Sequence, residues 1–258
     1  MPTGDMNGKH ALVFGVANQR SIAWGIAQAL HERGARLAFA YQGERFRSTV
    51  ETLAKDFVNP VYVECDVQSD EQIDACFASV QREMGGLDML VHSIASAKRE
   101  ELSGDFRDTS RDGYAYALEI SAYSLIALAK RAVPLMEGRN GSMIALSYLA
   151  AERAVPRYNV MGSAKAALEQ AVRQLAYELG PMNIRVNCIS AGAINTLSAR
   201  GVDGFTEMLK VYEARAPLRR SVTAEEVGKA AAFLLSGDAS GITGETLYVD
   251  SGYNIVGL

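Results

Sequence analysis

Cysteine is scarce in this chain of 258 residues, and the few cysteines do not form a framework. Cys65, Cys76 and Cys188 are far apart in the sequence and form no C-x-x-C pair. An odd number of widely spaced cysteines disfavours a set of disulfides and is typical of a reducing compartment. We therefore expect all three to be packing residues.

An excess of basic residues and long apolar runs are also absent. Lysine and arginine number 26 against 30 aspartates and glutamates, which gives a formal net charge of -4. Binding to a nucleic-acid backbone needs clustered positive charge, so nucleic acid is not an expected partner. No run approaches the roughly 18 apolar residues of a membrane span, and residues 1–10 contain no apolar signal-peptide core. The prediction is a cytoplasmic protein with no membrane partner and no metal ion.

The sequence does contain a regular alternation of short apolar runs and longer helical patterns. Hydrophobic residues make up 48% of the chain, enough for a sizeable core. Seven runs are predicted as strands, near residues 10–15, 36–41, 60–65, 87–92, 141–147, 184–190 and 246–250. Continuously apolar strands separated by helices indicate a parallel sheet covered on both faces. No linker or repeat interrupts the pattern, so residues 1–258 are predicted as a single α/β domain of the doubly wound, Rossmann type.

The junction between the first strand and the first helix carries the first functional signal. Gly15 follows the strand, and Ser21, Ile22 and Gly25 open the helix. A glycine lets the backbone turn close to a pyrophosphate, Ser21 offers a hydroxyl donor, and the helix N-terminus offers free N–H groups. The spacing departs from G-x-G-x-x-G, and a glycine at such a turn is often purely structural. Its place after the first strand favours a dinucleotide site.

The ends of the second and third strands indicate where an adenosine would bind. Gln42 stands where many such proteins place an acid for the ribose 2′-hydroxyl. Residues 41–43 contain no Lys or Arg for a 2′-phosphate, so NADH is favoured over NADPH. Asp66 and Val67 close the third strand, where a carboxylate can accept from the adenine amino group and valine can cover the ring. The alternatives are an ordinary loop residue for Gln42 and a helix N-cap for Asp66.

Ser93, Ile94 and Ala95 end the fourth strand. In this fold that segment brings backbone to the cofactor at the carboxyl edge of the sheet. His92, just before it, is interpreted as an interior residue rather than a catalytic base, because no acid lies near it in the sequence.

Tyr148, Tyr158, Met161 and Lys165 form the most informative group. Dehydrogenases of the short-chain type pair a tyrosine and a lysine four residues apart, with a serine thirteen residues before the tyrosine. Here those two positions hold Met161 and Tyr148, and Tyr158 lies seven residues before Lys165. Seven residues are about two helical turns, so we expect Tyr158 and Lys165 on one helix face, with Tyr158 one turn further out.

The displaced tyrosine has a chemical meaning. Ketone reduction delivers hydride to the carbonyl carbon, so the proton donor must lie beside the hydride acceptor. Reduction of an α,β-unsaturated thioester delivers hydride to the β carbon, while negative charge develops on a carbonyl oxygen two carbons away. Tyr158 suits the second reaction. The alternative is a surface tyrosine with a solvated lysine, but the pair follows the fifth strand, where the active site of this fold belongs.

Eight segments carry a resemblance that covers essentially the whole chain: GVANQRSIAWGIA, YQGERF, CDV, VHSIA, ISAYSL, AERAVPRYNVMGSAKAALE, RVNCISAG and LYVDSGYNI. Through them the sequence resembles the bacterial NADH-dependent enoyl-(acyl carrier protein) reductases of the short-chain dehydrogenase/reductase superfamily. The resemblance implies reduction of the double bond of trans-2-enoyl thioesters in type II fatty acid synthesis. It also implies a homotetramer, which agrees with the wide apolar surfaces of the helices predicted near residues 120–136 and 160–179.

The resemblance also implies roles for individual residues. Tyr158 would stabilise and protonate the enolate, Lys165 would hold the nicotinamide ribose, and Tyr148 would line the substrate side. Substrate contacts are expected from Ala97, Tyr148, Tyr158 and Met161. Cofactor contacts are expected from Gly15, Ser21, Ile22, Gln42, Asp66, Val67, Ser93, Ile94, Ala95, Lys165, Ile194, Asn195, Thr196, Leu197 and Ser198.

Two stretches depart from the family pattern. Ala193 and Asn195 replace a proline and a basic residue, which adds loop freedom and removes a charge near the pyrophosphate. Ala95 and Ser96 stand where the family more often has glycine and phenylalanine.

The segment 195–220 is expected to fold over the substrate as a helical flap. It has a local excess of two positive charges, on which an acidic carrier protein could dock, although a solvated helix face is an equal alternative.

Two other functions remain as alternatives. One is a ketoacyl or sugar reductase, which Met161 at the usual tyrosine position disfavours. The other is a non-catalytic NAD-sensing regulator, which would not need Tyr158 and Lys165 at this spacing.

Overall fold

The computed structural model describes residues 4–196 and 204–257, in which the chain forms a seven-stranded parallel sheet. The strands are β1 (His10–Phe14), β2 (Arg36–Tyr41), β3 (Val61–Glu64), β4 (Met89–His92), β5 (Ser142–Ser147), β6 (Arg185–Ala191) and β7 (Thr246–Val249). All seven predicted strands are confirmed, with bounds that differ by no more than two residues.

The strands lie in the order β3-β2-β1-β4-β5-β6-β7, and every neighbouring pair is parallel. The chain moves outward from β1 to β3 and then crosses back to place β4 on the other side of β1. In a doubly wound sheet the loops diverge at this reversal and leave a crevice at the carboxyl ends of the strands. The fold class predicted from the sequence is confirmed.

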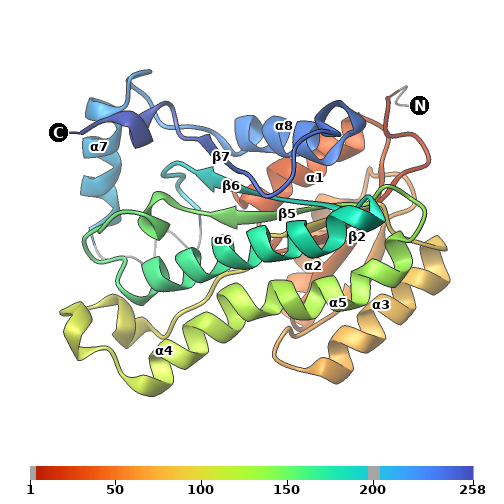
Figure 1. Ribbon diagram of the computed structural model, residues 1–258, viewed down its shortest axis with the longest axis horizontal. Helices are drawn as coiled ribbons and strands as arrows, with labels where there is room; N and C mark the ends of the chain where they lie inside the picture. Colours follow the sequence, from red (N-terminus) through yellow and green to blue (C-terminus); the bar gives the residue numbers. More distant parts are fainter. Residues whose placement is uncertain (1–3, 197–203, 258) are drawn as a thin grey trace.

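Helices cover both faces of the sheet (Figure 1). The helices α1 (Ile22–Glu32), α2 (Glu44–Leu53) and α8 (Ala224–Leu235) pack on one face, and α3 (Asp70–Met84), α5 (Ser124–Met136) and α6 (Val160–Leu179) pack on the other. Residues alternate along β1, so that Leu12 and Phe14 enter one core while Ala11 and Val13 enter the other. Both sides of the central strands β1, β4, β5 and β6 are buried, so these strands are mostly apolar, and this is why the sequence predicts them.

Two further helices lie beyond the sheet faces. The helix α4 (Arg111–Leu118) continues through a π-helical turn (Glu119–Tyr123) into α5, and α7 (Phe205–Arg215) lies within the segment predicted as a flap. Residues 197–203 of that segment lie outside the described part of the chain. Among the described helices, none combines the length and apolar character that a membrane crossing requires.

The helices α1 and α8 contact each other through two glycines. A Cβ on Gly25 would lie 2.3 Å from the carbonyl oxygen of Ala224, and a Cβ on Gly228 would lie 2.2 Å from the carbonyl oxygen of Gly25. These distances are far shorter than real contacts, so the two backbones touch where side chains would separate them. Gly25 lies in the first turn of the helix that begins the predicted dinucleotide site, so this packing also holds that end of the helix in place.

Gly25→Ala should therefore lower the free energy of unfolding by about 2–3 kcal/mol, because the methyl group must push α8 away from α1. Gly180→Ala is the matched control, since its Cβ would meet nothing within 4 Å and its backbone is helical. The control should stay within about 0.5 kcal/mol of wild type or be slightly stabilised. Urea unfolding followed by circular dichroism measures both, and equal stability of the two variants would contradict the close-packing account.

Candidate active site

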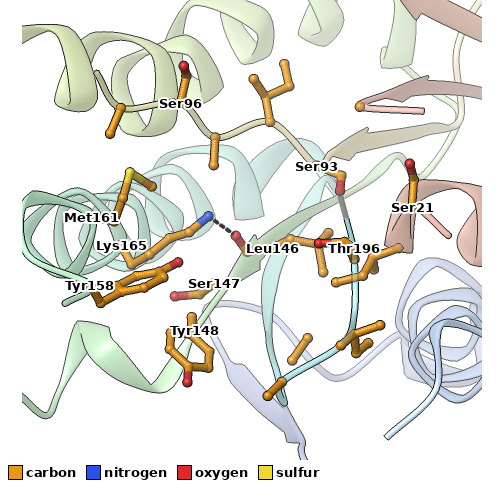
Figure 2. A pocket seen from close by; sticks show the side chains of 18 of the residues that line it. Ser21, Ser93, Ser96, Leu146, Ser147, Tyr148, Tyr158, Met161, Lys165 and Thr196 are labelled. Carbon is orange, nitrogen blue, oxygen red and sulfur yellow. Dashed lines mark hydrogen bonds between the residues drawn. The ribbon is translucent and has the colours of Figure 1, made fainter. Parts of the chain in front are cut away.

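A cavity of about 240 Å³ opens at the carboxyl ends of β1, β4, β5 and β6, and the first turns of α6 form one of its walls. Figure 2 shows Tyr158, Met161 and Lys165 at one end of this cavity and Ser21 at the other. The predicted site residues that line it are Gly15, Ser21, Ile22, Ser93, Ile94, Ala95, Ala97, Tyr148, Tyr158, Met161, Lys165, Ile194 and Thr196. Residues far apart in the sequence are thus brought to one edge of the sheet, as a doubly wound fold requires.

Gly15 lies where the loops after β1 and β4 touch. Its φ is +98°, and a Cβ there would lie 1.9 Å from the carbonyl oxygen of Ser93. Only glycine fits such a left-handed backbone pressed against another strand end. The result is a cavity floor made of bare backbone, which an extended phosphate group can approach closely.

Ser21 fixes the loop between β1 and α1. Its Oγ accepts hydrogen bonds from the backbone N–H groups of Ala17, at 3.0 Å, and Asn18, at 3.1 Å. The Ser21 hydroxyl proton can therefore be donated into the cavity, beside the N-terminus of α1 at Ile22. Free N–H groups and the positive end of a helix dipole favour an anion at this position. A glycine cradle, a hydroxyl donor and a helix N-terminus together fit the pyrophosphate of a dinucleotide.

Lys165 lies on α6 and is almost completely buried, with 6% of its surface exposed. Its Nζ donates a hydrogen bond of 2.6 Å to the backbone carbonyl of Leu146 on β5, the dashed line in Figure 2. Burial lowers the pKa of Lys165 to about 8, while Cys188 and Glu169 act in the opposite direction. The ammonium group has three protons, so two remain for a ligand in the cavity.

Tyr158 is not on the helix, and the expectation that it shares a helix face with Lys165 is wrong. The helix α6 begins at Val160, and the residues on either side of Tyr158 are left-handed, with φ of +65° at Arg157 and +42° at Asn159. Left-handed residues cannot continue an α-helix, so Tyr158 lies in a tight turn that precedes it. The turn is closed by hydrogen bonds from Tyr158 N to Val155 O, at 3.2 Å, and from Met161 N to Tyr158 O, at 3.1 Å.

The rings of Tyr148 and Tyr158 pack against each other, with centroids 4.8 Å apart and planes at 53°. Burial raises the pKa of Tyr148 to about 12, and burial also raises the pKa of Tyr158. Both phenols are therefore neutral hydrogen-bond donors near neutral pH. The Tyr148 hydroxyl lies 3.9 Å from the sulfur of Met208, which brings α7 to the cavity.

Met161 makes the wall near Tyr158 apolar. It is 6% exposed and packs in a small cluster with Ala117, Val160 and Ala164. Its sulfur lies 3.9 Å from the hydroxyl of Ser121, in the π-helical turn. No proton donor therefore occupies the position four residues before Lys165.

The residues predicted to bind adenosine lie together, but outside this cavity. Gln42 donates from Nε2 to Oδ2 of Asp66 at 2.8 Å, which joins the ends of β2 and β3. Asp66 is not the N-cap of α3, because Ser69 takes that position; its Oδ1 instead accepts from the backbone N–H of Gln68 at 3.0 Å. Val67 packs partly against the core.

The last part of the predicted cofactor segment is only partly described. Asn195 is not among the residues that line the cavity. Leu197 and Ser198 lie outside the described residues.

His92 is an interior residue, as the sequence indicated. It is fully buried, its Nε2 is hydrogen-bonded to Ser124 Oγ at 2.7 Å, and burial lowers its pKa to about 3. It is therefore neutral, and it does not line the cavity. Within residues 4–196 and 204–257 there is also no group of three His, Cys, Asp or Glu side chains that could hold a metal ion.

Sequence reasoning missed Ser147 and its partner. Ser147, on the cavity wall, donates from Oγ to Oε1 of Glu169 on α6 at 2.6 Å. The signal was a serine at the carboxyl end of a strand, hidden by the more conspicuous Tyr148 beside it. Other lining residues that were not predicted are Ala17, Ser96, Leu102, Leu146, Ala191, Gly192, Ala193 and Met208.

Comparison with known proteins places this site among related sequences. The profile of the family described as "Enoyl-(Acyl carrier protein) reductase" matches residues 15–254. The NADH-dependent enoyl-(acyl carrier protein) reductase FabI of Bacillus subtilis is 52% identical over 252 residues, 97% of each chain. The FabI of a Nostoc species is 52% identical over 257 residues, 98% of this chain and 99% of its own.

Solved structures agree with the sequence relatives. The Aquifex aeolicus NADH enoyl-(acyl carrier protein) reductase superposes with a TM-score of 0.96 at 48% identity, covering 99% of this chain and 100% of its own. The Anaplasma phagocytophilum enoyl-(acyl carrier protein) reductase in complex with NAD superposes with a TM-score of 0.95 at 45% identity, covering 100% and 98%. At these identities the likeness extends beyond the fold to the family.

Gly15→Ala should weaken NADH binding at least about tenfold, because a methyl group at φ +98° must displace the Ser93 carbonyl from the cavity floor. Gly85→Ala is the matched control: Gly85 also has a positive φ, of +72°, but its Cβ would meet nothing within 4 Å. The control should lose about 1 kcal/mol of stability and keep the wild-type Kd for NADH. Titration of NADH fluorescence measures the Kd, and an unchanged value for Gly15→Ala would refute the cradle.

Proposed function

The chain belongs to the enoyl-(acyl carrier protein) reductase family, and from this premise we propose how its residues reduce the double bond of a trans-2-enoyl thioester with NADH. The enzyme is an oxidoreductase of fatty acid synthesis. One observation supports the proposed mechanism above all. Tyr158 and Lys165 line the same cavity, while Met161 fills the position where a carbonyl reductase has its proton donor.

The cofactor would occupy the cavity from Ser21 to Lys165. Bound NADH supplies the hydride. Gly15, Ser21 and the N-terminus of α1 would hold the pyrophosphate, and Ile94, in the loop after β4, would contact the cofactor on the side of the nicotinamide. Lys165, whose Nζ is hydrogen-bonded to Leu146 O, would hold the nicotinamide ribose with its two remaining protons. The Gln42 and Asp66 pair would take the adenosine, by exchanging its mutual hydrogen bond for contacts with the ribose and the adenine amino group.

Tyr158 would act on the substrate's carbonyl oxygen. As C3 is reduced, negative charge develops on the thioester oxygen, and a donor aimed at that oxygen stabilises the transition state. The raised pKa of the partly buried Tyr158 keeps its proton on the hydroxyl until then. Tyr148 packs against Tyr158 and limits its movement, so that the hydroxyl stays at one position on the cavity wall.

The acyl chain would lie on the apolar part of the wall. Ala97, Leu102, Met161 and Met208 line it, and they come from the loop after β4, α6 and α7. Burying this wall under an acyl chain excludes water from the reacting bond. We extend the proposal to the domain organisation: residues 1–258 act as one domain, in which α7, within the predicted flap segment 195–220, would cover the acyl chain through Met208.

Docking of the acyl carrier protein is proposed for the arginines at the C-terminal end of α7 and just after it. Two of the basic residues in the segment 195–220 already form ion pairs within the chain: Arg220 with Glu226 at 2.6 Å, and Lys210 with Glu207 at 2.9 Å. Arg215 and Arg219 are exposed and form no ion pair within the described residues. Reversing both to glutamate should raise the KM for a carrier-linked enoyl substrate and leave the KM for a coenzyme A thioester unchanged.

Self-association in the cytoplasm is also proposed. Tyr123, the last residue of the π-helical turn, is 53% exposed, Ile126 on α5 is 44% exposed, and Tyr177 on α6 is 82% exposed. Large apolar side chains on two adjacent helices favour packing against another copy of the chain. The mass of the protein in solution separates a tetramer from a dimer.

Tyr158→Phe should lower kcat for a crotonyl thioester at least about tenfold and leave the Kd for NADH unchanged, because only the donor to the developing oxyanion is lost. The measurement is NADH oxidation followed at its absorbance, with Tyr177→Phe, an exposed tyrosine on α6, as the control. A wild-type enzyme that reduces an acetoacetyl thioester instead of the crotonyl thioester would support the carbonyl-reductase alternative.

A further inference from the structure

Glu169 is a buried carboxylate that the proposed mechanism does not use. It lies on α6 with 4% of its surface exposed, four residues after Lys165. Four residues are about one helical turn, so both side chains leave the same face of α6. A carboxylate is seldom buried unless it has a specific partner, because desolvation disfavours its charged form.

Two hydrogen bonds join α6 to the end of β5. Lys165 Nζ donates to the carbonyl of Leu146 at 2.6 Å, and Ser147 Oγ donates to Glu169 Oε1 at 2.6 Å. Leu146 and Ser147 are consecutive residues of the strand, and Lys165 and Glu169 are one turn apart on the helix. The strand end that leads directly into Tyr148 is therefore fixed to the two buried charged groups of α6.

Few other charged groups lie near Glu169 and Lys165. Burial raises the pKa of Glu169, and Glu152 acts in the same direction; Ser147, Arg173 and Lys165 lower it. Tyr248 on β7 also faces the carboxylate.

Lys165 faces Cys188 on β6 and the neutral His92 on β4. Among these groups, Glu169 is the carboxylate that favours the charged form of Lys165.

We propose that Glu169 is a positioning residue: its carboxylate, held by Ser147, is the buried counter-charge that keeps the Lys165 ammonium protonated and directed toward the nicotinamide ribose. The inference rests on the proposed role of Lys165 in cofactor binding. It assigns Glu169 no contact with substrate or cofactor, so Glu169 acts only through Lys165 and through the end of β5.

The proposal predicts the direction in which the pKa of Lys165 changes when Glu169 loses its charge. Lys165 loses its proton as the pH rises through its pKa, which is about 8 with Glu169 present. Removal of the negative charge disfavours the ammonium further, so the pKa of Lys165 falls. The pH at which NADH binding weakens should therefore move toward the acid side, while binding well below that pH stays close to wild type.

The experiment compares Glu169→Gln with the wild-type enzyme. Glutamine has nearly the same size and keeps an oxygen that accepts from Ser147, so it removes the charge and preserves the hydrogen bond. The Kd for NADH is measured by fluorescence between pH 6 and pH 10, and thermal unfolding is measured in parallel. We expect the midpoint of the loss of binding to fall by about one pH unit or more, with little change in Tm.

Two further variants complete the test. Ser147→Ala leaves the carboxylate charged but without the donor that holds it in place, so the midpoint for NADH binding should shift in the same direction by a smaller amount. Glu178→Gln removes an exposed carboxylate from the same helix and should shift nothing.

An unshifted midpoint in Glu169→Gln overturns the inference, whether or not the Tm changes. If Glu169→Gln does not fold, an unshifted midpoint in Ser147→Ala overturns it instead. A wild-type protein that fails to bind NADH or to reduce an enoyl thioester would contradict the proposed function itself, which separates the two failures.

Discussion

The hydrogen bond from Lys165 Nζ to the carbonyl of Leu146 is the interaction on which the site depends. It links the helix α6 to the carboxyl end of β5, in the middle of a sheet whose neighbouring strands are fixed by parallel pairing. Burying an ammonium group costs desolvation free energy unless hydrogen-bond acceptors surround it, so this side chain must point toward such acceptors. Once Lys165 is fixed, Met161 and the turn that carries Tyr158 are fixed with it.

The turn before α6 explains how one fold supports a different reaction. If the tyrosine lay on the helix, four residues before Lys165, its hydroxyl would lie beside the carbonyl carbon that receives hydride and would protonate the oxygen of that carbonyl. In this chain Met161 fills that place, and the left-handed residues Arg157 and Asn159 place Tyr158 in a tight turn at the same cavity. Under the proposed mechanism, this turn separates the proton donor from the carbon that receives hydride, as conjugate reduction requires. The irregular backbone would then be part of the chemistry and not merely a connection between elements.

Much of the fold could be predicted because its physical causes are local. Strands such as His10–Phe14 are buried on both sides, so they appear as continuous apolar runs, and the glycine at Gly15 marks the tight turn that follows. The turn at Tyr158 could not be predicted, because helical spacing of residues 158 and 165 does not reveal where a helix begins. The bond between Ser147 and Glu169 joins residues 22 positions apart, and only the packing of α6 on β5 brings them together.

The central claim is that the site reduces the double bond by adding hydride at C3 while Tyr158 stabilises charge on the carbonyl oxygen. The most direct measurement is the position of deuterium in the product when a crotonyl thioester is reduced by unlabelled NADH in deuterated water. The account predicts a saturated butyryl thioester with deuterium at C2 and only protium added at C3. Solvent deuterium at C3, or a product that keeps the double bond and has a reduced carbonyl, would contradict it.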